Sequence, residues 1–208
     1  MKKILFMGDS ITDFLRTSFG QGENLGMGYA RLIACNLSYE YPDEYEFVNR
    51  GISGNRIVDL LQRIKKDAIN HKPDYMSILI GVNDVWHEFD FQNGVDTKRF
   101  ELFYDLYIQQ LKEALPDLKI MIMEPFLLNT GAAEKNFDQF MPEVREKAAV
   151  AKRIAEKHGL KFIPLQEKLE EACKKAPASW WLYDGVHPAP AGHELIKNEW
   201  IKAFEEIK

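Results

Sequence analysis

A serine, an aspartate and a histidine in this sequence have the types and the spacing of an acyl-transfer site. Ser10 directly follows a short apolar run that ends in Gly8-Asp9, and Asp184 and His187 lie three residues apart near the other end of the chain. An aspartate at that spacing can accept a hydrogen bond from the imidazole Nδ1 and leave Nε2 free to take a proton from a serine. We therefore predict Ser10 as the nucleophile, His187 as the base and Asp184 as the group that orients the base.

Two further turns contain hydrogen-bond donors for the negative charge that such a reaction develops. The stretch 49–55 contains two closely spaced glycines, Gly51 and Gly54, which allow a tight turn with outward-pointing N–H groups. Asn83, in the run Gly-Val-Asn-Asp at 81–84, can donate from its side-chain amide. Each motif alone is also explained by a turn or a helix cap. Together they provide the nucleophile, base, orienting group and oxyanion donors that acyl transfer requires.

Motifs for other chemistries are absent from the sequence. It contains no GxSxG, GxxxxGK[ST], GxGxxG or HExxH pattern, which disfavours the usual α/β-hydrolase, nucleotide-binding and zinc-protease mechanisms. His71, His87 and His158 are interpreted as scattered surface or loop residues. His193 is the alternative base, although capping or packing of the last helix explains it better. No metal site and no cofactor are predicted.

The predicted catalytic residues need a scaffold that gathers distant parts of the chain. Short apolar runs predict strands, and amphipathic stretches predict helices between them. The expected strands are 4–7, 46–49, 76–81, 120–123 and 160–164, and the expected helices are 28–37, 57–69, 97–115, 142–158, 166–175 and 188–206. Segments 87–97 and 127–141 are expected to be long loops. This alternation predicts one α/β domain over 1–208, with a five-stranded parallel sheet covered on both faces and a site beyond the carboxyl ends of its strands.

Composition limits the classes of partner. The 208 residues are 46% hydrophobic and 28% charged, with a formal net charge of −5, which excludes a disordered chain and disfavours nucleic acid as a partner. The paired lysines at 65–66 and 174–175 are interpreted as solvated helix faces. No signal peptide or membrane span is recognised, so we expect a cytoplasmic protein that does not bind membranes. Cys35 and Cys173 are expected to be buried free thiols.

Four motifs together resemble the blocks of the SGNH (GDSL) hydrolases. These are Gly-Asp-Ser-Ile-Thr at 8–12, Gly51, Gly-Val-Asn-Asp at 81–84, and Asp-Gly-Val-His-Pro at 184–188, in the family's order. The resemblance implies a flavodoxin-like three-layer α/β/α sandwich with Ser10, Asp184 and His187 as catalytic residues. It also implies an oxyanion hole made of the Ser10 and Gly51 N–H groups and the Asn83 side chain. The stretches 49–61, 72–86 and 187–193 are further similar to the intracellular acetyl-xylooligosaccharide esterases of this family.

Aromatic residues near these motifs point to a sugar-containing substrate. Trp86 follows the Asn83 turn, and Trp180, Trp181 and Tyr183 precede Asp184. Aromatic faces can pack on the C–H faces of sugars, and we predict such a contact for Trp86; core packing and a subunit interface remain alternatives for these aromatics. The absence of a long apolar loop favours a short acyl group such as acetyl. Two alternatives stay open, namely a lysophospholipase- or thioesterase-like enzyme for longer acyl chains, and a non-catalytic sugar-binding module. A homo-oligomer is expected.

Overall fold

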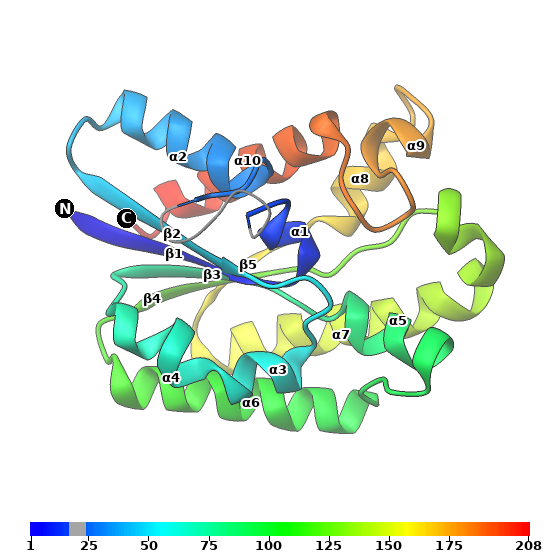
Figure 1. Cartoon of the computed structure of the whole chain (residues 1–208), viewed down its shortest axis with the longest axis horizontal. Helices are drawn as coiled ribbons and strands as arrows, with labels where there is room; N and C mark the ends of the chain where they lie inside the picture. Colours follow the sequence, from blue (N-terminus) through cyan, green and yellow to red (C-terminus); the bar gives the residue numbers. More distant parts are fainter. Residues whose placement is uncertain (17–23) are drawn as a thin grey trace.

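The computed structural model describes residues 1–16 and 24–208 and is built around one five-stranded sheet (Figure 1). The strands are β1 (Lys2–Gly8), β2 (Tyr45–Gly51), β3 (Tyr75–Leu79), β4 (Lys119–Met123) and β5 (Lys161–Ile163). All neighbouring strands are parallel, in the order β2-β1-β3-β4-β5. The chain moves outward from β1 to β2 and then returns past β1 to β3. The carboxyl ends of β1 and β3 therefore flank the switch point at which sheets of this kind bind ligands.

Helices cover both faces of the sheet, which gives the predicted three-layer sandwich. One layer contains α2 (Tyr29–Glu40), α8 (Gln166–Ala172) and α10 (Pro190–Glu205), and the other contains α3 (Ile57–Gln62), α4 (Ile64–Asp67), α6 (Thr97–Ala114) and α7 (Phe137–His158). Alternate residues of β1 point to opposite layers. Ile4 and Phe6 are buried in the first core, and Leu5 and Met7 in the second. The continuous apolar run in the sequence thus corresponds to a strand that is buried on both faces.

The expected helix 57–69 is divided into three short pieces. It consists of α3, α4 and a 3-10 turn, η2 (Ile69–His71), with the first break at Arg63. The Arg63 guanidinium donates to the backbone oxygens of Arg50 and Gly8, at the ends of β2 and β1. This contact ties the break in the helix to the edge of the sheet that carries the site.

The prediction that segments 87–97 and 127–141 are long loops is wrong in part, because both segments contain helix. The segment 87–97 begins inside α5 (Val82–Phe91), and 127–141 contains a 3-10 turn, η3 (Gly131–Asn136), and the start of α7. In α5 the apolar residues Val82, Val85, Trp86 and Phe89 follow helical spacing. The signal for α5 is therefore present in the sequence, although acidic and amide residues surround it.

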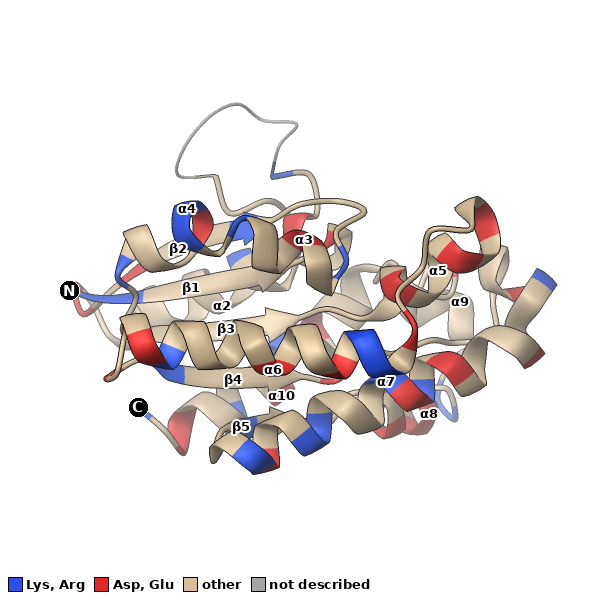
Figure 2. Ribbon diagram, turned by 90° about the horizontal axis from the view of Figure 1, so that it is seen from below, with Lys and Arg blue, Asp and Glu red and all other residues tan. Residues whose placement is uncertain are grey.

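Charges of both signs are mixed over the surface, as Figure 2 shows on α4, α6 and α7. The lysines at 65–66 and 174–175 are exposed, as expected. Cys35 is exposed, which corrects the prediction of a buried thiol, and Cys173 is partly buried; both are free. No helix within residues 1–16 and 24–208 combines the length and the apolar character needed to cross a membrane.

Candidate active site

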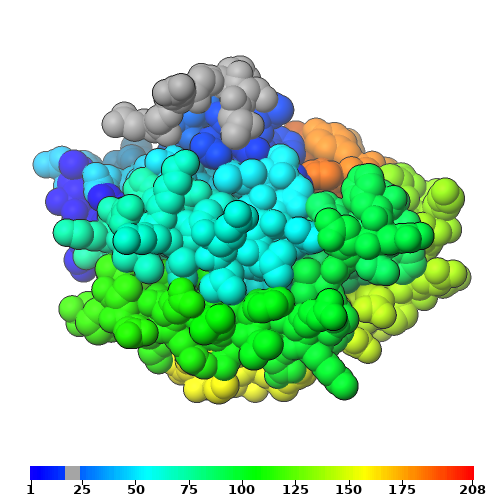
Figure 3. Space-filling model, turned by 60° about the horizontal axis from the view of Figure 1, so that its bottom comes forward, coloured from blue at the N-terminus to red at the C-terminus, as the bar shows by residue number. Residues whose placement is uncertain are grey.

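The predicted catalytic residues converge at the carboxyl edge of the sheet. Ser10 opens the short helix α1 (Ser10–Asp13) directly after β1, and Asn83 lies in the first turn of α5 after β3. Asp184 and His187 lie on the loop between α9 (Ala178–Trp181) and α10. On the face shown in Figure 3, the orange atoms around residue 180 lie near the blue atoms of the N-terminal turn and the green atoms of α5. Segments from both ends of the chain and from its middle therefore meet at one place.

The turn that carries Ser10 is shaped by its two neighbours in the sequence. The fully buried Asp9 caps α1, because its Oδ1 accepts a hydrogen bond from the Ile11 N–H at 3.0 Å. Gly8 leaves no room for a side chain, since a Cβ there would collide with the Thr12 hydroxyl and the Leu79 carbonyl oxygen. The turn packs closely against β3, and the partly exposed Ser10 hydroxyl is held at the mouth of the sheet.

Three side chains form one continuous hydrogen-bonded row. The Ser10 Oγ lies 2.8 Å from His187 Nε2, and His187 Nδ1 lies 2.7 Å from Asp184 Oδ2. The second carboxylate oxygen of Asp184 accepts from the backbone N–H groups of Val186 and His187, at 3.0 and 2.8 Å. The Asp184 carboxylate is therefore fixed by three donors, which leaves His187 Nε2 directed at the serine hydroxyl.

The loop that carries Asp184 and His187 is held from outside by a second loop. The Ala133 N–H donates to the Asp184 carbonyl oxygen, and the Leu128 N–H donates to that of Gly185. Gly185 has a positive φ of 96°, and a Cβ there would strike the Ala133 methyl group. A glycine is required at this point both for the backbone conformation and for the close approach of the two loops.

The electrostatics of the row favour a basic imidazole. The hydrogen bond to Asp184 raises the pKa of His187 against the opposing effect of burial, and the charges of Asp184 and Asp9 raise it further. Burial disfavours ionisation of Asp184, but the bonds from the His187 side chain and from the backbone N–H groups of His187 and Val186 outweigh it and lower its pKa to about 2. Asp184 is therefore an anion at neutral pH, and the imidazolium that forms on proton transfer would lie beside it.

The hydrogen-bond donors around the serine differ in one respect from the prediction. The Gly51 N–H donates to Asn49 Oδ1 at 2.8 Å, so it is not free to bind an oxyanion. A Cβ at Gly51 would strike the backbone of α1, which explains this glycine by close packing alone. The Ser10 N–H has no acceptor within the described chain. The side-chain nitrogen of Asn83 donates to the Asn55 carbonyl oxygen at 3.1 Å, which orients the amide, and its second N–H has no acceptor among the residues that the structure describes.

The backbone N–H of Gly54, unlike that of Gly51, is available to donate a hydrogen bond to an oxyanion. The Ile52 N–H bonds to the Gly8 carbonyl oxygen, and the carbonyl oxygen of Asn55 accepts from Asn83. The turn between them, with Gly54 at φ 81°, is therefore held between the serine turn and α5. The Gly54 N–H has no acceptor among residues 1–16 and 24–208. The sequence predicts Gly54 as part of this turn, whereas, of the two glycines, the family resemblance assigns the oxyanion role to Gly51 alone.

Two residues considered as candidates have partners inside the protein. His193 is almost fully buried, and its Nδ1 accepts from the Tyr29 N–H, so it caps α2 and not its own helix. Burial lowers the pKa of His193 to about 3, which makes it a neutral structural group. Trp86 is partly buried, packs edge-on against Phe140 at 5.0 Å between ring centroids and donates to Asp90. Within the described residues, no three His, Cys, Asp and Glu side chains are grouped so that they could hold a metal ion.

A buried carboxyl next to Asn83 makes the stability of the fold depend on pH. Asp84 is 1% exposed and accepts a hydrogen bond from the Ile57 N–H, the first residue of α3. Burial raises its pKa from 3.8 to about 7, despite the Ile57 bond and the nearby charges of Lys147 and Arg56. At a pH between the unfolded pKa and the folded pKa, the folded protein keeps a proton on Asp84 that the unfolded chain has lost. The free energy of unfolding therefore decreases as the pH rises through this range.

We therefore expect Asp84→Asn, which keeps an acceptor for Ile57, to gain stability relative to the wild type as the pH rises from 4 to 8. The difference between the two pKa values corresponds to an upper limit of about 4 kcal/mol. Urea unfolding of both proteins at pH 4, 6 and 8 measures this gain. A stability difference that stays constant over this range would contradict the prediction.

Comparisons with known proteins agree with the geometry. The chain matches the model of the GDSL-like lipase/acylhydrolase family over residues 6–195. It is 33% identical to an acetylxylan esterase from Geobacillus stearothermophilus over 224 aligned positions, which cover 100% of this chain and 96% of that protein.

Solved structures are similar over nearly the whole chain. A GDSL-like lipase from Parabacteroides merdae superposes with a TM-score of 0.92 at 35% identity, covering 98% of this chain and 95% of that one. Axe2, an acetylxylan esterase from Geobacillus stearothermophilus, superposes with a TM-score of 0.85 at 32% sequence identity, covering 97% of this chain and 93% of that one. LAE5, an alpha/beta hydrolase enzyme from the metagenome of Lake Arreo, superposes with a TM-score of 0.86 at 27% sequence identity, covering 100% of this chain and 96% of that one. The chain thus belongs to the GDSL-like lipase/acylhydrolase family and is a carboxylic ester hydrolase.

Proposed function

We propose that this protein removes acetyl groups from carbohydrates, with acetylated xylo-oligosaccharides as the substrate class, through an acyl-serine intermediate. The observation that carries the mechanism is the unbroken row from Ser10 Oγ through His187 to Asp184, with contacts of 2.8 and 2.7 Å. The substrate class is supported by the similar protein named acetylxylan esterase and by the structure of Axe2, which carries the same name. We also propose that the chain acts as one domain over 1–208.

In the proposed first step, Ser10 Oγ attacks the carbonyl carbon of the ester while His187 Nε2 takes its proton. Asp184 stabilises the resulting imidazolium and holds the ring in the orientation that the transfer requires. The former carbonyl oxygen becomes negatively charged and accepts hydrogen bonds from the Ser10 and Gly54 N–H groups and from Asn83. The C–O bond to the alcohol then breaks as the imidazolium gives its proton to the departing oxygen, and the acetyl group remains on Ser10 Oγ as an ester.

In the second step, water replaces the serine ester by the same route. His187 takes a proton from the water as its oxygen attacks the acetyl carbonyl, and the same donors stabilise the second oxyanion. When this intermediate breaks down, the proton returns to Ser10 Oγ and acetic acid is released. The step consumes one water molecule and restores the free enzyme.

Acetate release from a panel of substrates tests this function. We expect the purified protein to release acetate from acetylated xylo-oligosaccharides and to hydrolyse p-nitrophenyl acetate much faster than p-nitrophenyl octanoate or palmitate. Faster hydrolysis of the long-chain esters would instead indicate the lysophospholipase- or thioesterase-like alternative. A folded protein that a serine-directed fluorophosphonate does not label would indicate a sugar-binding module.

The contact of Trp86 with sugar is a prediction. Trp86 has partners inside the protein, so a contact with sugar would use the part of its ring that remains exposed. Trp180 and Tyr183 are 62% and 57% exposed close to the catalytic loop, which suits either a sugar or another subunit. The homo-oligomeric state and the cytoplasmic location are predictions of the same kind.

A further inference from the structure

The imidazole of His87 lies beside the proposed oxyanion turn and has no role in the mechanism above. His87 is on α5, one helical turn after Asn83, so the two side chains lie on the same face of the helix. The atoms closest to the position of a Cβ on Gly54 are Cε1 and Nε2 of His87, both at 3.9 Å. The ring is partly exposed, and neither ring nitrogen has a hydrogen-bond partner in the described part of the chain. An imidazole with two free nitrogens thus borders the site.

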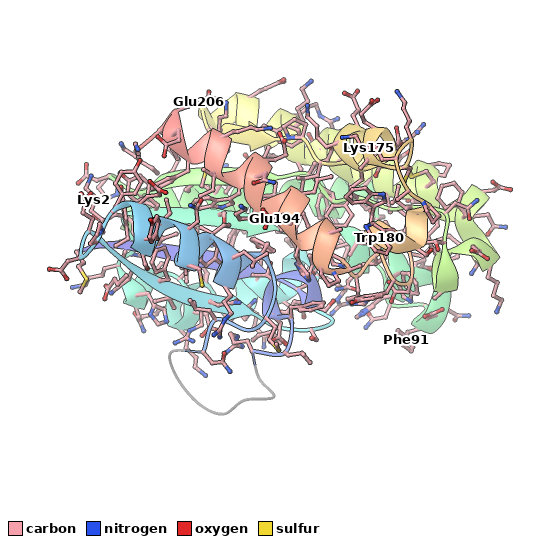
Figure 4. The ribbon with its side chains drawn as sticks, turned by 90° about the horizontal axis from the view of Figure 1, so that it is seen from above. Lys2, Phe91, Lys175, Trp180, Glu194 and Glu206 are labelled. Carbon is pink, nitrogen blue, oxygen red and sulfur yellow. The ribbon has the colours of Figure 1, made fainter. Side chains whose placement is uncertain are left out.

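An exposed aromatic ring, that of Phe91, packs against the His87 imidazole. Phe91, the last residue of α5, is 66% exposed and packs edge-on against His87, with 5.4 Å between the ring centroids. In Figure 4, Phe91 lies at the same end of the molecule as Trp180, away from Lys2 and Glu206. A phenyl ring left in water at this end of the sheet is available to be covered by a bound molecule.

The charge state of His87 limits the chemistry of that molecule. Burial, followed by the positive charge of Arg56, lowers the pKa of His87, and the charges of Asp59 and Asp90 oppose this effect only in part. At neutral pH one ring nitrogen therefore donates and the other accepts. A neutral group of this kind suits a hydroxyl, which both donates and accepts, better than a phosphate or a carboxylate.

We propose that His87 and Phe91 form a subsite for the sugar that carries the ester, in which the imidazole bonds a sugar hydroxyl and the phenyl ring covers a C–H face. This assignment rests on the proposed function and concerns the alcohol side of the substrate. An acetyl methyl group has no hydrogen bond to offer His87 and is too small to cover Phe91. A pyranose ring has hydroxyl groups around its edge and apolar faces, and it matches both residues.

The test compares two acetyl esters that differ in the alcohol, an acetylated xylo-oligosaccharide and p-nitrophenyl acetate. The measured quantity is the ratio of kcat/KM for the sugar ester to kcat/KM for p-nitrophenyl acetate. His87→Ala is expected to lower this ratio about tenfold, the size of one lost hydrogen bond, mainly through the KM for the sugar. His87→Gln, which keeps a donor and an acceptor, is expected to recover most of the loss. Phe91→Ala is expected to lower the ratio several-fold.

Tyr39→Ala is the matched control for Phe91, since Tyr39 is an aromatic residue on α2 with 82% exposure, and it should leave the ratio unchanged. Equal losses on both esters in His87→Ala would show that His87 acts through the oxyanion turn and would overturn the subsite. An unchanged ratio in that variant would also overturn it. If the wild type hydrolyses neither ester, the proposed function itself is wrong. If it hydrolyses only p-nitrophenyl acetate, the esterase mechanism stands while the sugar substrate and the subsite fall.

Discussion

Ser10→Ala is expected to lower kcat by at least about 10⁴-fold. Without the hydroxyl, no acyl-enzyme forms, and the donors that remain can only assist attack by water. The fold should tolerate the change, because Ser10 is partly exposed and, among residues 1–16 and 24–208, its side chain bonds to His187 alone. The measurement is the pre-steady-state burst of p-nitrophenol from p-nitrophenyl acetate, which should disappear.

Ser38→Ala provides the matched control for the loss of Ser10, since Ser38 is an exposed serine on α2. This variant should show the full burst and normal labelling by a fluorophosphonate. A burst of wild-type size in Ser10→Ala, with thermal unfolding unchanged, would assign the nucleophile to another residue.

Asn83→Ala is expected to lower kcat by about 100- to 1000-fold, with a smaller change in KM. The reason is that its amide would donate to an oxygen on which negative charge develops in the transition state and is absent from the ester in its ground state, so binding of the substrate loses little. Asn83→Asp should be at least as damaging, because it places an acceptor, and at neutral pH a negative charge, where the reaction develops one. Single-turnover kinetics on p-nitrophenyl acetate measure the effect on the acylation step.

Asn70→Ala serves as the control for Asn83. Asn70 is exposed on η2, shortly before the amino end of β3, whereas the site lies at the carboxyl ends of the strands. Its kcat should equal that of the wild type. Near-normal turnover in Asn83→Ala would remove Asn83 from the oxyanion hole and leave that role to backbone N–H groups alone.

The buried strands were predictable because both of their faces lie in the core. Runs such as Ile4–Met7 contain four apolar residues in succession, and all four are fully buried. The order of the strands was not predicted, since it depends on contacts between helices and strands that are distant in the sequence. Helix α5 was missed although its apolar spacing is regular, because its Asp, Glu and His residues are also common in loops.

The side chains of the candidate site could be predicted from the sequence, whereas the backbone N–H groups that face it could be predicted less well. The proposed chemistry uses the side chains of Ser10, Asn83, Asp184 and His187, so their types and order in the chain were enough to select them as candidates. Gly51 has no side chain, and its proposed role depended on where its N–H points. That direction is set by Asn49, whose side chain accepts from the N–H two residues later, a pattern typical of an Asx turn. An asparagine two residues before a glycine is a signal that could have excluded Gly51.

The hydrogen bonds from the His187 ring to Asp184 and to Ser10 span very different lengths of chain. Its bond to Asp184 joins residues three apart, whereas its bond to Ser10 joins residues 177 apart. The acid–base pair can therefore assemble within one local turn, while activation of the serine must wait until the first and last elements of the chain have docked on the sheet. Reactivity of the serine consequently reports completed folding, so fluorophosphonate labelling during refolding should rise only with the slowest structural phase, after helical circular dichroism has recovered.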